Sequence, residues 1–385
     1  MRIVHTSDWH AGRVFKRLDR LPELADVLEH LGDWLERERT DLLLMSGDVF
    51  DGGAPPAEAE RLVFGFFKRV GRAGVHTVVI GGNHDSPARL EAWGGLAELV
   101  NVAVVARPRA ADRGGLLRIE TRSGETALVA AVPFASPRDL VSGLQMAEDD
   151  TKAKQAYADT FKRMVENVTT PFHVDAVNLL LLHTHLEGAA FSGSERTVHL
   201  GDEWAAAPQA LPATAHYIAL GHIHRPQRVK VAPAPAYYAG SPLQLDFGEA
   251  GEEKSFVSIE ARPRQPVRCD RVPYQGGRPL LRVRHTLPEI EVEASRLAGS
   301  GWLWVSVPLE TPDLDIGSKV RKLLPNALRV EVELPKAEAA IDPDRPRAGA
   351  SHLELFEAYS RRQHQAPPSP DLVAAFQALR AECET

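Results

Sequence analysis

Five stretches of this chain end an apolar run with aspartate, asparagine or histidine. In chain order these residues are Asp8 and His10, Asp48 and Asp51, Asn83, His84 and Asp85, His183, and His222 and His224. A single histidine after an apolar run is more often an ordinary buried or exposed side chain than a ligand. Five such endings in one chain predict a shared polar site.

These donors suit divalent metal ions. Imidazole and carboxylate groups without thiolate favour Mn, Mg, Fe or Zn, and the candidates are too numerous for one closed tetrahedral site. We therefore expect two ions, with Asp48 as the shared carboxylate. The ions carry more positive charge than Asp8 and Asp48 return, so the site should bind an anion. Two ions about 3.5 to 4 Å apart can activate water and clamp both oxygens of a displacement at phosphorus.

In the stretch "GGNHD" we expect the neighbouring residues to have different functions. Its two glycines allow a sharp bend out of a strand, so that Asn83 can reach a metal ion while His84 turns toward the substrate. His84 would stabilise the phosphoryl oxygens or protonate the leaving alkoxide. Asp51 either orients the His84 ring or is an ordinary loop carboxylate. Asp85 is favoured to be an exposed loop carboxylate or a turn cap.

Alternating strands and helices must position these residues. Residues 2–10, 41–48 and 76–82 predict strands, and two apolar periodicities between them predict helices, which implies a mostly parallel sheet. Ligands of such sheets bind beyond the carboxyl ends of the strands. Because residues two apart on a strand share a face, Asp8 with His10 and His222 with His224 would each point to one place.

The rest of the chain predicts a second sheet and two further parts. From about residue 100 strands dominate, interrupted by a charged helix near 148–168. These strands indicate a second sheet packed on the first, which makes residues 1–270 a two-sheet α/β sandwich. The expected further parts are a small β-α-β-α-β cap domain over 277–334, a linker over 335–350 and a helical tail over 351–381.

The tail carries an apolar stripe on two short helices. Its members are Leu353, Phe356, Tyr359, Leu372 and Phe376. Helices this short are marginal by themselves in water, so they either fold back onto the body or dock on a partner.

Composition limits the class of protein. A chain of 385 residues with 44% hydrophobic and 25% charged residues is typical of a folded protein of two or three units. The formal charge of -7 means that any nucleic-acid surface must be local. Two distant cysteines, Cys269 and Cys383, disfavour a disulfide framework. With no signal peptide or membrane span expected, we predict a cytoplasmic protein that is nucleoid-associated when it acts on DNA.

The ordered set "SDWH", "GDVFD", "GNHD", "LLHTHLEG" and "GHIH" resembles the calcineurin-like metallophosphoesterases. The opening "MRIVHTSDWHAGR", the segments "IALGHIHRPQ" and "YAGSPLQLDF", and the cap and tail resemble the members of that family that are bacterial nucleases. Those members work with an ATPase in DNA double-strand-break processing.

The resemblance implies a centre of two manganese ions, with magnesium as the other candidate. One ion would be held by Asp8, His10, Asp48 and His224, and the second by Asp48, Asn83, His183 and His222. His84 would be catalytic. The fourth motif of the family has one histidine, whereas this chain has His183 and His185. His183 is preferred because its spacing to Glu187 and Gly188 fits the family.

The resemblance also implies an activity and partners. The activity is that of a 3′-5′ exonuclease on duplex ends and an endonuclease on single strands or hairpins. The cap would contact DNA, and the tail would bind the coiled-coil base of the ATPase. A homodimer would form through helices near the active-site face. Candidate contributors, each equally compatible with ordinary core packing, are Leu62, Phe66, Phe67, Leu90, Trp93 and Leu96.

Two other functions fit the sequence. The same chemistry would serve a phosphatase or a phosphodiesterase acting on nucleotides or phosphoproteins, although such an enzyme needs neither cap nor tail. A scaffold that tethers an ATPase would need no intact ligand set.

Overall fold

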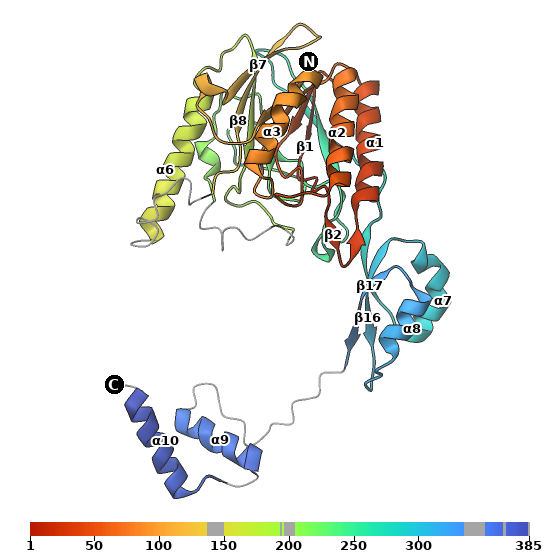
Figure 1. Cartoon of the computed structure of the whole chain (residues 1–385), viewed down its shortest axis with the longest axis vertical. Coiled ribbons are helices and arrows are strands. Elements are labelled where there is room, and N and C mark those ends of the chain that lie inside the picture. Colours follow the sequence, from red (N-terminus) through yellow and green to blue (C-terminus); the bar gives the residue numbers. More distant parts are fainter. Residues whose placement is uncertain (137–149, 193–194, 196–204, 335–350, 365–366, 384–385) are drawn as a thin grey trace. The chain divides into compact units, whose positions relative to one another are not determined.

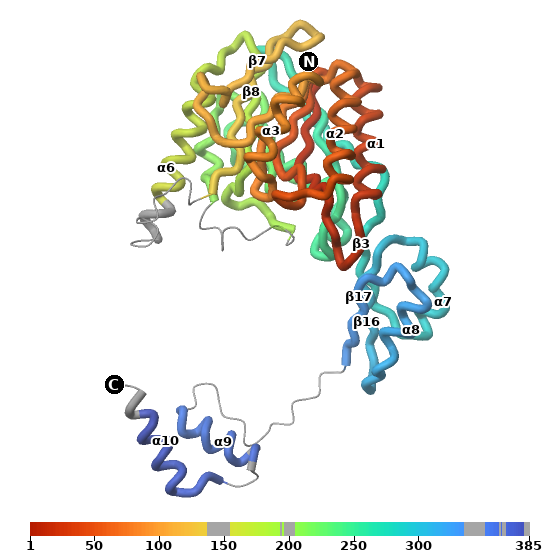
Figure 2. The backbone as a smooth tube through the Cα atoms, in the orientation of Figure 1, coloured from red at the N-terminus to blue at the C-terminus, as the bar shows by residue number. Residues whose placement is uncertain are grey.

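The computed structural model describes residues 1–136, 150–192, 195, 205–334, 351–364 and 367–383, and Figure 2 traces its backbone. The predicted linker over 335–350 lies outside these residues. One compact unit comprises Met1–Val307 and Asp315–Glu331, and a second comprises Pro308–Leu314 and Val332–Thr385. The domain boundaries expected from the sequence stay a prediction. No helix in the described ranges is long and apolar enough to cross a membrane.

The first sheet has six strands and contains the N-terminal half of the predicted site. Its order is β14 (Arg268–Pro273), β13 (Ser255–Glu260), β1 (Arg2–Thr6), β4 (Leu42–Met45), β5 (His76–Ile80) and β6 (Val102–Val105). The four strands from β1 to β6 run parallel, and β13 is antiparallel to β1. The carboxyl ends of β1, β4 and β5 therefore meet at one edge.

The second sheet contains the other half. Its order is β11 (Gln227–Arg228), β12 (Ala236–Tyr238), β10 (Tyr217–Gly221), β9 (Val177–His183), β8 (Thr126–Val132) and β7 (Leu116–Glu120). The expectation that all strands after residue 100 join this sheet was wrong for β6 and β13. β6 extends the parallel order beside β5, and β13 returns to pair with β1.

The sheets and helices form four layers, which confirms the predicted α/β sandwich. Figure 1 shows α1 (Leu21–Arg37), α2 (Ala57–Arg72) and α3 (Pro87–Ala97) together beside the β1 sheet, and α6 (Asp150–Thr169) beside β8. Strand β1 alternates between two cores: Ile3 packs between the sheets and Val4 packs under the helices. Burial on both faces explains why β4, for example, is apolar throughout.

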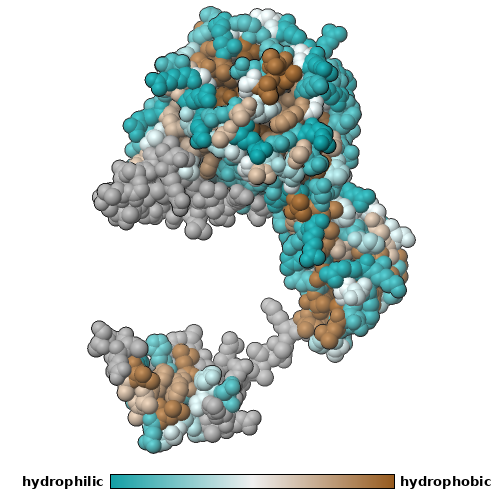
Figure 3. All heavy atoms as spheres, viewed as in Figure 1, coloured by the Kyte–Doolittle hydropathy of each residue, from teal (hydrophilic) through white to brown (hydrophobic). Residues whose placement is uncertain are grey.

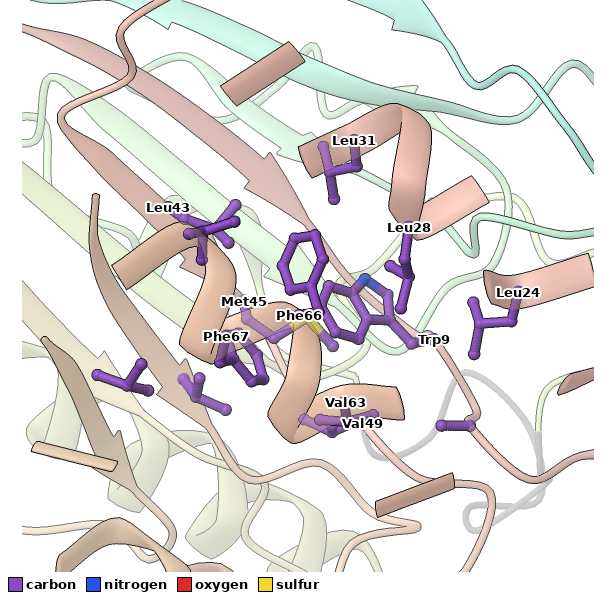
Figure 4. Close-up of a cluster of buried hydrophobic side chains, with 14 of the residues drawn as sticks. Trp9, Leu24, Leu28, Leu31, Leu43, Met45, Val49, Val63, Phe66 and Phe67 are labelled. Carbon is purple, nitrogen blue, oxygen red and sulfur yellow. The ribbon is translucent and has the colours of Figure 1, made fainter. Parts of the chain in front are cut away.

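The core under α1 and α2 anchors the first motif. Trp9 is 1% exposed and lies between two rings, edge-on to Phe66 and stacked on Phe67. Figure 4 shows it among Leu24, Leu28 and Val63. Its Nε1 donates to Thr6 Oγ1 at 2.8 Å. The residue between Asp8 and His10 is thus fixed in the core, which limits where its two neighbours can point.

The predicted cap forms a three-stranded sheet with two helices. Its elements are β15 (Leu280–Arg284), α7 (Leu287–Ala298), β16 (Trp302–Pro308), α8 (Ile316–Leu323) and β17 (Ala327–Glu333). Leu280 N donates to Gln244 Oε1 at 2.6 Å, and Trp302 Nε1 donates to Glu23 Oε1 at 2.9 Å. These bonds tie the cap sheet to the sandwich.

The remaining described elements are a hairpin, 3-10 helices and the tail helices. They are the hairpin β2 (Val14–Phe15) and β3 (Leu18–Asp19), the 3-10 helices η1 (Glu98–Val100), η2 (Ala111–Arg113), η4 (Pro208–Ala210) and η5 (Phe247–Glu249), and the tail helices α9 (His352–His364) and α10 (Pro370–Cys383).

We expect Leu28→Ala to lower the free energy of unfolding by about 3 kcal/mol, because it removes a side chain that is 1% exposed in the core shown in Figure 4. The matched control is Leu314→Ala, whose leucine is 100% exposed and should cost less than about 0.5 kcal/mol. Urea unfolding followed by circular dichroism measures both. Equal losses would contradict this placement of the core.

Candidate metal centre

The predicted polar residues lie at the carboxyl ends of strands from both sheets, His183 as the last residue of β9 and the others in the loops that follow their strands. The loops after β1 and β4 are joined by backbone bonds, from Asp8 N to Gly47 O at 3.0 Å and from His10 N to Asp48 O at 3.1 Å. The loop after β10 joins them because His222 N donates to Asp8 Oδ1 at 3.0 Å. These hydrogen bonds thus fix the positions of the three loops relative to one another.

Left-handed backbone conformations, rather than strand alternation, aim the side chains. β1 ends at Thr6, so neither Asp8 nor His10 lies on it, and both have positive φ angles, 52° and 47°. Asp48 and His222 also have positive φ, 51° and 97°. The predicted alternation was wrong as the reason for their convergence. Such conformations are costly for non-glycine residues and persist only where surrounding contacts fix them.

Glycines allow the loops to approach closely. A Cβ on Gly82 would lie 2.1 Å from Asp48 Oδ1, and one on Gly221 would lie 1.9 Å from Ser46 O. Neither Gly81 nor Gly82 has a positive φ. The chain does bend at residues 83–85, directly after this pair, but the bend needs no left-handed glycine. Gly82 is needed for space beside Asp48.

Three groups of side chains have ligand atoms close enough to share a metal ion. They are Asp8, His10 and His224; His10, Asp48 and His84; and Asp8, Asp48 and His183. Asn83 and His222 adjoin them, because Asn83 Oδ1 lies 2.9 Å from His183 Nε2 and 2.8 Å from His222 Nδ1. The structure thus brings all seven predicted ligands and His84 together.

Asp48 lies at the centre of the cluster. Its Oδ2 is 3.6 Å from His10 Nε2 and also 3.6 Å from His183 Nε2. Its Oδ1 accepts the backbone N–H of His84 at 2.8 Å. One oxygen is thus fixed by the protein while the other faces imidazoles from both halves, which suits a shared carboxylate.

The hydrogen bonds of the imidazoles fit a bound cation. His10 Nδ1 bonds Asp51 Oδ1 at 3.1 Å, and His183 Nδ1 donates to Ser46 O at 2.8 Å. Each Nε2 then presents a lone pair to the centre. His10 Nε2 is 3.1 Å from His224 Nε2, and His183 Nε2 faces the carbonyl oxygen of Asn83. Facing acceptors repel each other unless a proton or a metal ion lies between them.

Asn83 gives a second sign of the same kind. Its Nδ2 is buried without a hydrogen-bond partner, while its Oδ1 faces two imidazoles. A buried amide hydrogen without a partner is costly. The side chain is thus oriented to present its oxygen to the centre, as a ligand for a hard cation would be.

Burial makes the cluster unfavourable for uncompensated charge. It raises the pKa of Asp8 well above its ordinary value and also raises the pKa of Asp48. It lowers the pKa of His183 to about 4 and that of His10 well below its usual range. Cations at the centre would let both carboxylates ionise while the imidazoles stay neutral ligands.

His84 and Asp51 interact differently from the sequence prediction. His84 Nδ1 donates to the backbone carbonyl oxygen of Asp51 at 2.9 Å. The Asp51 carboxylate instead accepts from His10 Nδ1 and from Arg13 Nη1, at 3.1 and 3.0 Å. Asp51 therefore orients His84 through its main chain and His10 through its side chain. The expected carboxylate contact with His84 was wrong.

The two residues left open have different surroundings. His185 is buried and packs against Phe191, with ring centroids 4.5 Å apart, whereas His183 lies in the cluster. Asp85 is buried rather than exposed, and it accepts the backbone N–H groups of Val49, Phe50 and Gly82 at 3.0 to 3.2 Å. It thus works as a turn cap that joins two motifs.

Sequence reasoning missed a buried pair behind His224. Glu249 Oε1 lies 3.4 Å from His224 Nδ1, and Glu249 Oε2 lies 2.6 Å from Lys254 Nζ. Both residues occur in "FGEAGEEKSF", where nothing in the charge pattern separates buried Glu249 from exposed Glu253. Only the fold distinguishes them.

The tail helices pack on each other through two of the predicted stripe residues. Phe356 and Phe376 stack with centroids 4.3 Å apart, and Leu353 is half-buried. Tyr359 and Leu372 are 61% and 48% exposed. Figure 3 shows apolar side chains on the surface of this helix pair.

Comparison with known families matches the geometry. The family model described as calcineurin-like phosphoesterase matches residues 1–226, which include every residue of the cluster. The chain belongs to this family. As a member of this family, the chain is a hydrolase. Membership also implies that divalent metal ions bind at the cluster just described.

Curated relatives narrow the resemblance. The SbcD subunits of nuclease SbcCD from Bacillus subtilis, Rhodobacter capsulatus and Escherichia coli are 32%, 30% and 29% identical to it. The alignments cover 100%, 82% and 94% of this chain and 99%, 82% and 92% of the relatives. The phosphoesterase is therefore a member of the SbcD family, which confirms the more specific resemblance seen in its sequence.

We expect Gly82→Ala to weaken Mn(II) binding about tenfold or more, because its Cβ would displace the Asp48 carboxylate. Gly52→Ala is the matched control, since a Cβ there meets nothing within 4 Å. Isothermal titration of metal-free protein measures both affinities. Equal affinities would show that Asp48 does not depend on the space left by Gly82.

Proposed function

We propose that this chain is the nuclease component of a DNA break-processing complex. It would act with Mn(II), or with Mg(II), as a 3′-5′ exonuclease on duplex ends and as an endonuclease on single strands or hairpins. The observation that carries the proposal is the convergence of seven ligand side chains from both sheets, with Asp48 at their centre. Relatives named as components of nuclease SbcCD support DNA as the substrate.

We assign the ligands to two sites that share Asp48. Asp8, His10 and His224 would complete one site, as their mutual proximity supports. Asn83, His183 and His222 would complete the other, as their contacts through Asn83 Oδ1 support. Two divalent ions bound there would activate a water molecule and neutralise charge on the scissile phosphate.

His84 would act on the leaving side of the reaction. Its Nδ1–H is held by the Asp51 carbonyl, so a protonated ring would present Nε2–H to the phosphate. As the water oxygen bonds to phosphorus and the opposite P–O bond breaks, His84 would stabilise the phosphoryl oxygens and give its proton to the leaving alkoxide. The edge-to-face contact with the His10 ring, 4.5 Å between centroids, places it beside the ligands.

The cap would contact the DNA. One face of its sheet carries Trp304 between two arginines, with Arg282 Cζ 4.5 Å and Arg329 Cζ 3.9 Å from the ring centroid. Arg284 follows on the same face of β15 and is exposed. Guanidinium groups neutralise phosphates, and aromatic rings beside them suit unpaired bases. Glu331 lies on this face too, 3.6 Å from Arg329 and 3.1 Å from Trp304 Nε1, so the local positive charge comes from Arg282 and Arg284.

The tail would bind the SbcC ATPase through its exposed apolar residues. Pairing of Phe356 with Phe376 leaves Tyr359 and Leu372 on the outside of the helix pair. Exposed apolar side chains on two adjacent helices suit a coiled-coil partner.

A homodimer would use the surface of α3 and η1. Leu96 is 71% exposed and Leu99 is 83% exposed. Of the other candidates, Phe66, Phe67 and Leu90 are buried in the core, and Leu62 and Trp93 pack partly against it. We place this assembly in the cytoplasm, at the nucleoid when it acts on DNA.

A phosphatase or nucleotide phosphodiesterase is the second candidate, because the same cluster would serve it. The argument against it is the Trp304 face, which a small substrate would not require. A scaffold without catalysis would not need buried acceptors facing each other in a ready cation site.

We expect His84→Gln to reduce cleavage of end-labelled duplex DNA about 100-fold or more while Mn(II) binding is kept. His76→Gln is the matched histidine control and should retain full activity, because His76 lies at the start of β5 whereas His84 follows the end of that strand. Reactions with Mn(II), Mg(II) or EDTA, beside a small phosphodiester, measure metal dependence and substrate class. Cleavage of the small ester but not of DNA would favour the phosphatase or phosphodiesterase over the nuclease. Unchanged activity in His84→Gln would contradict the catalytic role of His84.

We expect Tyr359→Ala with Leu372→Ala to weaken binding of SbcC at least tenfold, because both side chains are exposed and contribute little to folding. Leu379→Ala is the matched control, since Leu379 is 62% exposed on α10 but lies outside the predicted set. Biolayer interferometry measures the affinity, and small-ester cleavage should be unchanged. Equal binding by all variants would exclude this surface.

A further inference from the structure

A buried ion pair lies behind the imidazole of His224. Glu249, on η5, is fully buried, and Lys254 is 7% exposed. The two oxygens of Glu249 face different groups: Oε1 lies 3.4 Å from His224 Nδ1, and Oε2 lies 2.6 Å from Lys254 Nζ. Leu245 N also donates to Oε2, at 3.1 Å. The carboxylate thus joins the imidazole to a buried ammonium group.

Lys254 is itself fixed from three sides. Besides Glu249, its Nζ donates to the His224 carbonyl oxygen at 2.9 Å and to Glu252 Oε2 at 3.0 Å. Ser192 Oγ in turn donates to Glu252 at 3.2 Å. A buried carboxylate is tolerated only when paired and hydrogen-bonded, and Lys254 meets this need for Glu249.

The main chain of His224 is held independently of Glu249. Its N–H donates to Glu195 Oε1 at 3.0 Å, and its carbonyl oxygen accepts from Lys254. These main-chain bonds do not fix the rotation of the imidazole about its side-chain bonds. Of the contacts described here, the contact with Glu249 is the one that involves the ring itself, at Nδ1.

We propose that Glu249, fixed by Lys254, is a positioning residue for His224: it accepts Nδ1–H and so points the Nε2 lone pair at one metal ion. This inference rests on the proposed metal centre and adds a residue to it. Two other imidazoles of the cluster have the same arrangement, since His10 Nδ1 bonds Asp51 and His183 Nδ1 bonds Ser46 O. Glu249 would give His224 the same arrangement as these two imidazoles. Such outer carboxylates commonly set tautomer and ring orientation at metal sites.

The test compares Glu249→Gln and Glu249→Leu with Glu252→Gln in the full chain. Glu252→Gln is the matched control, because Glu252 contacts Lys254 and Ser192 but is not the partner of the His224 ring. Mn(II) titration of metal-free protein, followed by electron paramagnetic resonance, gives the affinity and number of bound ions. Thermal unfolding of each variant reports the fold.

We expect Glu249→Gln to lower the affinity for one of the two Mn(II) ions about tenfold and Glu249→Leu to lower it further. Glu252→Gln should bind Mn(II) with the affinity of the unmodified chain. If Glu249→Gln binds both ions with unchanged affinity, the inference is overturned while the metal centre stands. If the unmodified chain binds no divalent ion, the proposed function itself fails.

A second measurement needs no stable variant at Glu249. Nitrogen-15 spectra of histidine-labelled, metal-free protein distinguish a ring that carries its proton on Nδ1 from one that carries it on Nε2. We expect His224 to be protonated at Nδ1, with its signals assigned by their loss in His224→Gln. A neutral His224 protonated at Nε2 would overturn the inference, because Glu249 would then have no proton to accept.

Discussion

The site depends on one buried carboxylate. Asp48 Oδ1 is fixed by the His84 backbone, and its Oδ2 is equally distant from imidazoles on the two halves of the centre. Burying this group costs free energy unless positive charge compensates it. Burial lowers the pKa of both facing imidazoles, His10 and His183, so the compensation expected from this family is divalent cations.

The rest of the sandwich keeps that carboxylate in place. Trp9 is locked in the helix-covered core and thereby fixes the residues on either side of it. Gly82 leaves room for Asp48, and Asp85 binds backbone N–H groups of both neighbouring loops. Core packing, the absence of a side chain on Gly82 and the hydrogen bonds of Asp85 thus all fix the position of the Asp48 carboxylate. The same contacts explain how several residues keep left-handed backbone conformations at this edge of the sheet.

The segment after β12 connects the metal centre with the cap. On η5, Phe247 packs against Trp304 with centroids 5.8 Å apart, and Glu249 lies behind His224. Upstream, Gln244 accepts from Leu280 N and donates to Glu252 O. The domain proposed to contact DNA and the cluster proposed to cut it are therefore held by one short stretch of chain.

The sequence by itself determined the alternating elements, the two-sheet sandwich and the polar residues that end five strands, because apolar runs and their polar endings are local signals. It could not assign β6 and β13 to the first sheet, since strand partners are chosen by long-range pairing. It also placed the Asp51 side chain on the wrong imidazole and left Glu249 unnoticed. Those contacts join segments as far as 41 residues apart, such as His10 with Asp51, and only tertiary packing decides them.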